Sequence, residues 1–149
     1  MSEQREQRKF VFGSREWFEE FVRVLNSDEE YAKAAKNWED PLILVVTDLP
    51  QPVREHFRTE KVVVWMDLYH GKCRGFEFLS SPEEKPAPII ISGTYENMKK
   101  VAQGRLSPTM AFMTGQLRVK GDVGKLLSNA AASSAFVNAL KKVPTEFLA

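Results

Sequence analysis

Features that define several common classes of small protein are scarce in this chain of 149 residues. It has a single cysteine, Cys73, so no disulfide can form within it, and it has only two histidines. Its longest apolar runs, Leu42–Val46 and Val62–Met66, are far below the roughly 18–20 residues that cross a bilayer as a helix. We therefore expect neither a disulfide framework nor a membrane-spanning segment.

An excess of charge of either sign is also lacking, because 21 basic residues face 20 acidic ones and the net charge is +1. Such a balance provides no general attraction to nucleic acid, so we expect no nucleic-acid partner. The first ten residues are mostly polar and lack the apolar stretch of a secretory signal. Together with the lone thiol, this favours a cytoplasmic location.

Recognisable catalytic and cofactor motifs are missing as well. Neither Gly71-Lys72 nor Gly124-Lys125 has the spacing of a phosphate-binding loop, and no G-x-G-x-x-G sequence occurs. His70 and Cys73 are three residues apart at a turn, but nothing nearby completes a metal site or a catalytic pair. We expect no cofactor, no metal and no catalytic residue.

Two carboxylates are the only candidates for general acid or base chemistry. Asp67 and Glu77 fall within expected strands, so either could be buried as a general acid or base, although strand alternation can equally expose it. His56 lies beside a proline-rich loop and is expected at the surface.

The order of helices and strands predicted from hydrophobic periodicity is that of an α+β domain. The chain is long enough to form one domain with a core of its own. We expect a flexible N-terminus over 1–13 and a single domain over 14–149. Ser14 is the expected N-cap of the first helix, and Ser27 with Glu30 forms a capping box for the second. The remaining expectations are a strand over 42–47, a loop from Pro50, a hairpin over 61–80, a short strand over 89–91, short helices after Thr94 and Ser107, a strand over 117–121 and one long helix over 123–142.

Charge is unevenly distributed along the chain. Residues 14–40 hold four basic and eight acidic side chains, whereas residues 99–142 hold eight basic side chains and a single acidic one, Asp122. The basic third either serves solubility and helix C-termini or forms an anion-attracting rim that meets phosphate groups or an anionic membrane.

The most specific pattern is the run GRLSPTMAFMTGQLRVKGD over residues 104–122. It resembles the signature of the sterol carrier protein type two family, with its glycine-basic-apolar helix entry, its A-F-x-x-G turn and its alternating basic and apolar strand. Thr114 stands where well-known members carry glutamine, and the peroxisomal import tripeptide of some members is missing. The matching positions are Gly104, Arg105, Leu106, Pro108, Ala111, Phe112, Gly115, Leu117, Val119 and Gly121.

The resemblance implies a five-stranded antiparallel or mixed sheet covered on one side by helices, with an apolar tunnel between them. Small residues over 130–135 in the last helix either leave volume there or allow close packing. The apolar faces of the predicted helices and strands supply the residues that we expect in the tunnel wall. We expect nearby polar residues at the tunnel mouth and two cations in an anion-binding rim. The wall is Phe18, Phe21, Val64, Met66, Met98, Val101, Phe112, Met113, Leu127 and Phe136, the mouth Thr114 and Gln116, and the rim Arg105 and Lys120.

The function that the resemblance implies is non-catalytic binding or transfer of a fatty acid, fatty acyl-CoA, sterol-like molecule or other lipid. Two alternatives stay open at this point. The chain is an accessory module that presents a quinone or acyl intermediate to partner enzymes, or it is a small enzyme acting on acyl-CoA, which needs a buried ionisable group in the tunnel.

Overall fold

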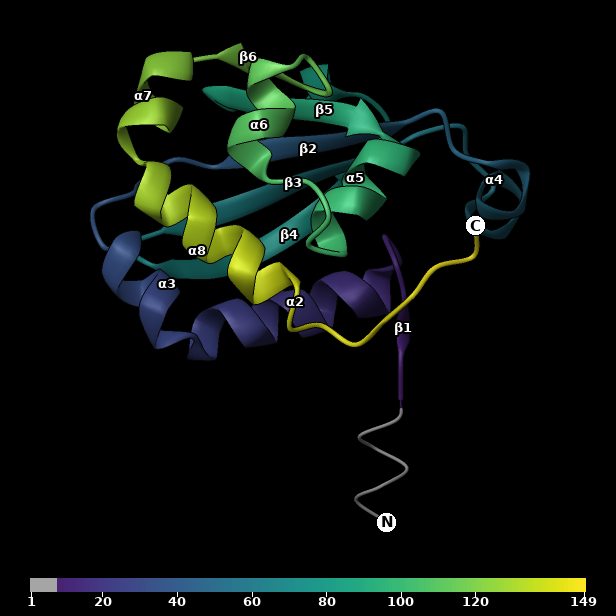
Figure 1. The fold of residues 1–149 in the computed structure, drawn as a ribbon, viewed down its shortest axis with the longest axis horizontal. Coiled ribbons are helices and arrows are strands. Elements are labelled where there is room, and N and C mark those ends of the chain that lie inside the picture. Colours follow the sequence, from purple (N-terminus) through teal and green to yellow (C-terminus); the bar gives the residue numbers. More distant parts are fainter. Residues whose placement is uncertain (1–7) are drawn as a thin grey trace.

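The computed structural model describes residues 8–149, which form a five-stranded sheet with helices packed across one of its faces (Figure 1). The strand order is β4-β3-β2-β5-β6, and a separate two-stranded pairing joins β1 and β7. The strands are β1 (Phe10–Val11), β2 (Leu42–Thr47), β3 (Val62–Tyr69), β4 (Lys72–Leu79), β5 (Ile89–Thr94), β6 (Leu117–Gly121) and β7 (Thr145–Glu146).

The sheet is mixed because its central pair is parallel. β2 runs parallel to β5, whereas β2–β3, β3–β4 and β5–β6 are antiparallel. The hairpin between β3 and β4 turns at His70 and Gly71, both of which have positive φ, and a Cβ at position 71 would lie 2.7 Å from the carbonyl oxygen of Ala32. The predicted α+β class with a five-stranded mixed sheet is confirmed.

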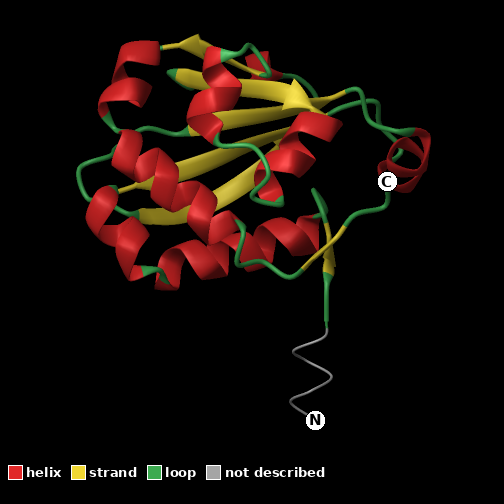
Figure 2. Cartoon of the chain, viewed as in Figure 1, coloured by secondary structure: helices red, strands yellow, loops and turns green. Residues whose placement is uncertain are grey.

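The helices lie mainly on one side of the sheet, and Figure 2 shows this two-layer arrangement. They are α2 (Arg15–Ser27), α3 (Glu29–Ala34), α4 (Gln51–Phe57), α5 (Tyr95–Ala102), α6 (Pro108–Met113), α7 (Val123–Ser128) and α8 (Ala130–Leu140), with a 3₁₀ turn over Pro82–Glu84. On the opposite face, a smaller cluster of Ile43, Val45 and Val63 is buried against Leu79 and Ala87. Both faces of the central strands are therefore apolar.

Local capping chemistry explains several helix starts. The hydroxyls of Ser14, Thr94 and Ser107 accept hydrogen bonds from the backbone N–H three residues on, as the sequence predicted. The prediction of a capping box at Ser27 is wrong, because Asp28 caps α3 instead and α2 continues through Ser27. The side-chain hydroxyl of Ser27 donates back to the carbonyl of Arg23, as a serine inside a helix does.

Two further expectations about helices need correction. The expected long helix over 123–142 is two helices, because Asn129 leaves helical geometry and its side-chain amide donates to the carbonyl of Lys125. The loop expected from Pro50 contains the helix α4, for which Pro52 near the first turn is well suited.

The chain ends are tied together by a pairing that the sequence did not predict. Residues 1–7 of the expected flexible N-terminus lie outside the described residues, but β1 is paired in parallel with β7. Phe12 follows β1 and packs edge-on against Trp17, with ring centroids 5.1 Å apart. The side chains of Phe10 and Phe12 therefore connect this segment to the core of the domain. In the described part of the chain, no helix is both long and apolar enough to cross a membrane.

Asp28 joins α3 to the end of α8. Its carboxylate accepts hydrogen bonds from the backbone N–H of Tyr31 at 2.9 Å and from the ammonium of Lys142 at 2.8 Å. The hydrogen bond from Lys142, followed by that from Tyr31, holds the pKa of the Asp28 carboxyl below its ordinary value. Because the folded-state pKa is depressed, this contribution to stability is present above the unfolded-state pKa and is lost as pH falls through the folded-state value.

We predict that Asp28→Ala lowers the free energy of unfolding by about 0.5–2 kcal/mol at pH 7, the usual loss for an N-cap. Urea denaturation at pH 7 and at pH 3 measures it, and the difference from wild type should shrink at the lower pH. Asp28→Asn, which keeps a capping oxygen but no charge, should lie between the two. Equal stability of wild type and Asp28→Ala at pH 7 would contradict the assignment.

Candidate functional site

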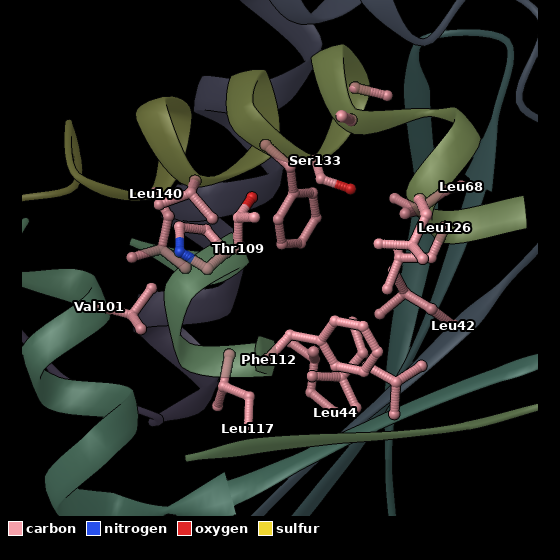
Figure 3. Close-up of a pocket in the computed structure, with 18 of the residues that line it drawn as sticks. Leu42, Leu44, Leu68, Val101, Thr109, Phe112, Leu117, Leu126, Ser133 and Leu140 are labelled. Atoms are coloured by element: carbon pink, nitrogen blue, oxygen red, sulfur yellow. The ribbon is translucent and has the colours of Figure 1, made fainter. Parts of the chain in front are cut away.

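A cavity of about 170 Å³ lies between the sheet and the helix layer. Its floor is formed by side chains of one sheet face, contributed by β2, β3, β5 and β6: Leu42, Leu44, Leu68, Ile91, Leu117 and Val119. In Figure 3, Leu42 and Leu44 point into the space from the sheet, while Ser133 and Leu140 point into it from α8. The cavity thus occupies the place where a helix would otherwise pack directly on the sheet.

The roof comes from several helices. α3 and the segment after it contribute Tyr31 and Trp38, and α5, α6 and α7 contribute most of the remaining aliphatic wall. α8 crosses above the cavity with Ala132 and Ser133 turned toward it, whereas Ala135 is buried but does not line it. The small residues of this helix therefore do both things that the sequence left open, since some border free volume and others allow close packing.

The lining of the cavity is predominantly apolar. None of the residues that line the cavity in the described part of the chain is an acid, a lysine, an arginine or a histidine. Hydroxyl groups come from Thr109, Ser133 and Tyr31, and burial raises the pKa of the Tyr31 phenol far above its ordinary value, so it stays neutral. Because burying a charge without a partner is costly, the interior suits a hydrocarbon and excludes a charged group.

The cavity opens to solvent between α6, α7 and α8. Of the residues that line it, Thr109, Leu127 and Ala130 are exposed, and Leu127 retains 54% of its accessible surface. We call this opening, defined by these three residues, the mouth.

The structure brings together five of the ten predicted wall residues on this cavity: Met98, Val101, Phe112, Leu127 and Phe136. Met98 and Val101 also border a second, smaller cavity, whose wall includes two more of the predicted residues, Phe18 and Val64.

The other three wall predictions fall elsewhere. Phe21 and Met66 are fully buried in the core and line neither cavity, because neighbouring side chains enclose them completely. Met113 is 74% exposed and Met110, the other methionine of α6, is 55% exposed, so the helix turns both of them to solvent.

The predicted mouth residues serve a different purpose. The hydroxyl of Thr114 lies 2.8 Å from the carbonyl oxygen of Met110 and 3.0 Å from the amide oxygen of Gln116, so both side chains help to close the end of α6. Neither residue lines the cavity. The polar residue at the mouth is Thr109, whose place could have been found from its i, i+3 spacing with Phe112 on α6.

The two cations predicted to form the anion rim, Lys120 and Arg105, lie in different places relative to the cavity. Lys120 belongs to the other face of β6 from Leu117 and Val119, which line the cavity, so strand alternation directs it away. Arg105 is exposed in the loop before α6. Its neighbour Gly104 has positive φ and lies against the aliphatic stem of Lys141, so the two cations flank the same turn.

The ionisable residues considered as catalytic candidates do not line the cavity. Asp67 is paired with Arg74 at 3.0 Å, Glu77 with Lys85 at 3.0 Å, and His70 with Glu39 at 2.6 Å. His56 is exposed on α4, while Cys73 is 3% exposed on β4. Within residues 8–149, no group of three or more His, Cys, Asp or Glu side chains is arranged to hold a metal ion.

A profile of the SCP-2 sterol transfer family matches residues 18–133, which include most of the cavity wall. The chain belongs to this family. The resemblance read from residues 104–122 is therefore confirmed. Membership in the SCP-2 family supports lipid binding or transfer in general terms.

Solved structures of SCP-2 family members share the fold. A crystal structure of sterol carrier protein 2 is 32% identical, with a TM-score of 0.76 over 89% of this chain and 98% of the other. A solution structure from Thermus thermophilus, described as possibly a sterol carrier protein, is 30% identical, with a TM-score of 0.77 over 93% and 94% of the two chains.

The curated relatives are much longer proteins. Hydroxysteroid dehydrogenase-like protein 2 of Xenopus tropicalis is 38% identical over 63 residues, which are 42% of this chain and 14% of that protein. This SCP-2 chain therefore matches only a small part of that relative.

Cys73 is buried in the core and lines neither cavity. Its thiol donates to the carbonyl of Gly75 at 3.3 Å, and burial raises the pKa of the thiol above its ordinary value. We predict that dithionitrobenzoate modifies Cys73 in the folded protein on the order of a hundredfold more slowly than in urea. Absorbance of the released thiolate measures the rate, with Cys73→Ala as the blank. Rapid stoichiometric modification of the folded protein would show an accessible, reactive thiol instead.

Proposed function

We propose that this chain binds the hydrocarbon part of a fatty acid or fatty acyl-CoA in the cavity and transfers it without chemical change. The observation that carries the proposal is the lining, because it combines an open mouth with an interior that contains no ionisable acid, lysine, arginine or histidine. An alkyl chain gains about 0.8 kcal/mol for each methylene removed from water, so affinity needs no charged contact inside.

The polar end of such a ligand would stay outside. A carboxylate or phosphate is strongly solvated and would remain at the mouth, where Thr109 is exposed. Arg105 and Lys141 flank the turn that leads into α6, and no salt bridge within the described residues occupies either of them. Arg105 precedes Thr109 of the mouth by four residues, so it is the cation suited to attract an anionic headgroup, whereas Lys141 follows the end of α8 that lies away from Ala130 of the mouth.

The mouth also has the character of a membrane-contacting face. Met110, Met113 and Leu127 are three of the four large apolar side chains that are exposed in residues 8–149, and all three belong to α6 or α7. Exposed apolar side chains beside cations are typical of a surface that rests on an anionic bilayer. We propose transient contact of this face with anionic membranes during uptake and release.

The buried, unpaired cysteine fits a reducing compartment, and we propose that transfer occurs in the cytoplasm.

Blocking the cavity tests the proposed function. Ser133 lines the cavity, whereas the adjacent Ser134 is exposed and does not. We predict that Ser133→Phe weakens palmitate binding at least about tenfold, since the ring occupies space that otherwise buries two or more methylenes. Ser134→Phe is the matched control and should bind as the wild type does. Displacement of a fluorescent fatty acid gives the dissociation constants.

The wild type should also retain lipid in native mass spectrometry. Failure of wild type to bind any fatty acid at micromolar concentration, or an equal loss in both serine variants, would overturn the proposed function.

Membrane contact is tested separately by sedimentation with vesicles. We predict that wild type binds phosphatidylcholine vesicles containing phosphatidylglycerol but not pure phosphatidylcholine, and that salt weakens binding. Changing Met110 and Met113 together to serine should reduce vesicle binding about tenfold, because two apolar groups are lost from the contact. Tyr69→Ser removes the fourth exposed apolar side chain, at the β3–β4 hairpin, and should have no effect. Equal effects of the two changes would refute this assignment of the face.

The accessory-module alternative uses the same cavity to present a quinone or acyl intermediate to partner enzymes. Purification of the protein from cell extract distinguishes presentation to partner enzymes from lipid transfer. Discrete enzymes recovered together with a quinone-type lipid favour presentation, whereas the protein alone with mixed fatty acids favours transfer. The small-enzyme alternative loses support because its candidate residues Asp67, Glu77, His56 and His70 lie outside the cavity wall.

A further inference from the structure

A second apolar cavity, of about 60 Å³, adjoins the first at the end of the helix layer near α2 and α4. Its walls include Phe12, Trp17, Phe18, Phe57 and Val62, none of which lines the larger cavity. Like the first, it is bordered by no acid, lysine, arginine or histidine in the described part of the chain. Its lining therefore suits the same kind of hydrocarbon.

Four residues border both cavities: Leu44 from β2, Met98 and Val101 from α5, and Leu140 from α8. We call these four the partition. In Figure 3, Val101 and Leu140 stand at the end of the larger cavity opposite Leu126 and Leu68. A chain that enters beside α7 and continues along the sheet would therefore meet the partition next.

Size makes the partition important. An apolar cavity of about 150 Å³ takes a ligand the size of benzene. The larger cavity, at about 170 Å³, is only slightly bigger and cannot enclose a long alkyl chain by itself. Either most of the chain stays outside the protein, or the chain gains space beyond the partition.

Met98 is the member of the partition best suited to move. Its side chain is unbranched and can change shape at little cost, whereas the other three carry branched side chains. Beneath it lies Gly93, where a Cβ would be 3.4 Å from the terminal methyl of Met98 and 2.6 Å from a methyl of Leu117. Both side chains therefore already fill the space over the glycine, and Met98 makes way for a chain by turning toward the cavities that it borders.

We infer that Met98 is a movable partition, and that a single unbranched alkyl chain passes it so that the methyl end of the chain occupies the second cavity. Met98 then determines the chain length that the protein prefers. A rigid fused-ring lipid is too wide to pass a gap opened by one side chain, so the preferred class is the flexible single chain. This inference rests on the proposed function, because it needs a lipid in the larger cavity.

The test compares the chain-length dependence of binding in wild type and Met98→Trp. Wild-type affinity should rise from octanoate through laurate to palmitate as more methylenes are buried. The indole fills the passage, so Met98→Trp should weaken palmitate binding at least about tenfold more than it weakens octanoate binding, the contribution of two methylenes. Met98→Leu, of similar size but branched, should bind palmitate with an affinity between those of wild type and Met98→Trp.

A measurement on the unaltered protein makes the test independent of whether Met98→Trp folds. Palmitate labelled with ¹³C at its terminal methyl should give nuclear Overhauser contacts to Phe57 or Val62, which border only the second cavity. Contacts to Trp38 or Leu126 alone, which border only the first, would overturn the inference. So would an equal loss of octanoate and palmitate binding in folded Met98→Trp. Both outcomes leave the proposed function standing, whereas absence of any fatty-acid binding removes the proposed function itself.

Discussion

The position of α8 is the constraint on which the cavity depends, because this helix has to stand above the sheet without collapsing onto it. Phe136 holds it there by packing edge-on against Phe21, with ring centroids 5.1 Å apart, and at a tilt against Tyr31, with centroids 6.2 Å apart. Beyond the end of the helix, Lys142 reaches Asp28 at the start of α3. The aromatic contacts, made to helices rather than to strands, leave the sheet face free to border open space.

Features set by neighbouring residues were predictable from the sequence, and features set by distant ones were not. Hydroxyl caps at Ser14, Thr94 and Ser107 act within three residues, and the β3–β4 hairpin turns at Gly71. The break at Asn129 escaped prediction because its apolar flanks fit one continuous helix. The pairing of β1 with β7 joins segments more than 130 residues apart and leaves no local signal.

The candidate site was predictable in kind but only partly in detail. The helical wall positions at Met98, Phe112 and Phe136 followed from periodicity. The residues of the cavity floor could not be predicted in this way. Leu42 and Leu44 alternate with Ile43 and Val45, and both sets are apolar. Alternation identifies a face only when the other face is polar. The decisive information lay in the sheet order, which places helices over one of two equally apolar surfaces.

The parallel pairing of β1 with β7 has a mechanical consequence. The amide of Phe10 donates to the carbonyl of Pro144, and that of Phe12 to the carbonyl of Glu146, at 2.9 Å each. Because the two strands run in the same direction, tension that draws the start of β1 away from the end of β7 acts along the strands. Both bonds then share the load in shear instead of opening one after the other. Phe12, whose amide makes one of these bonds, also lines the smaller cavity, so the same pairing holds part of that wall in place.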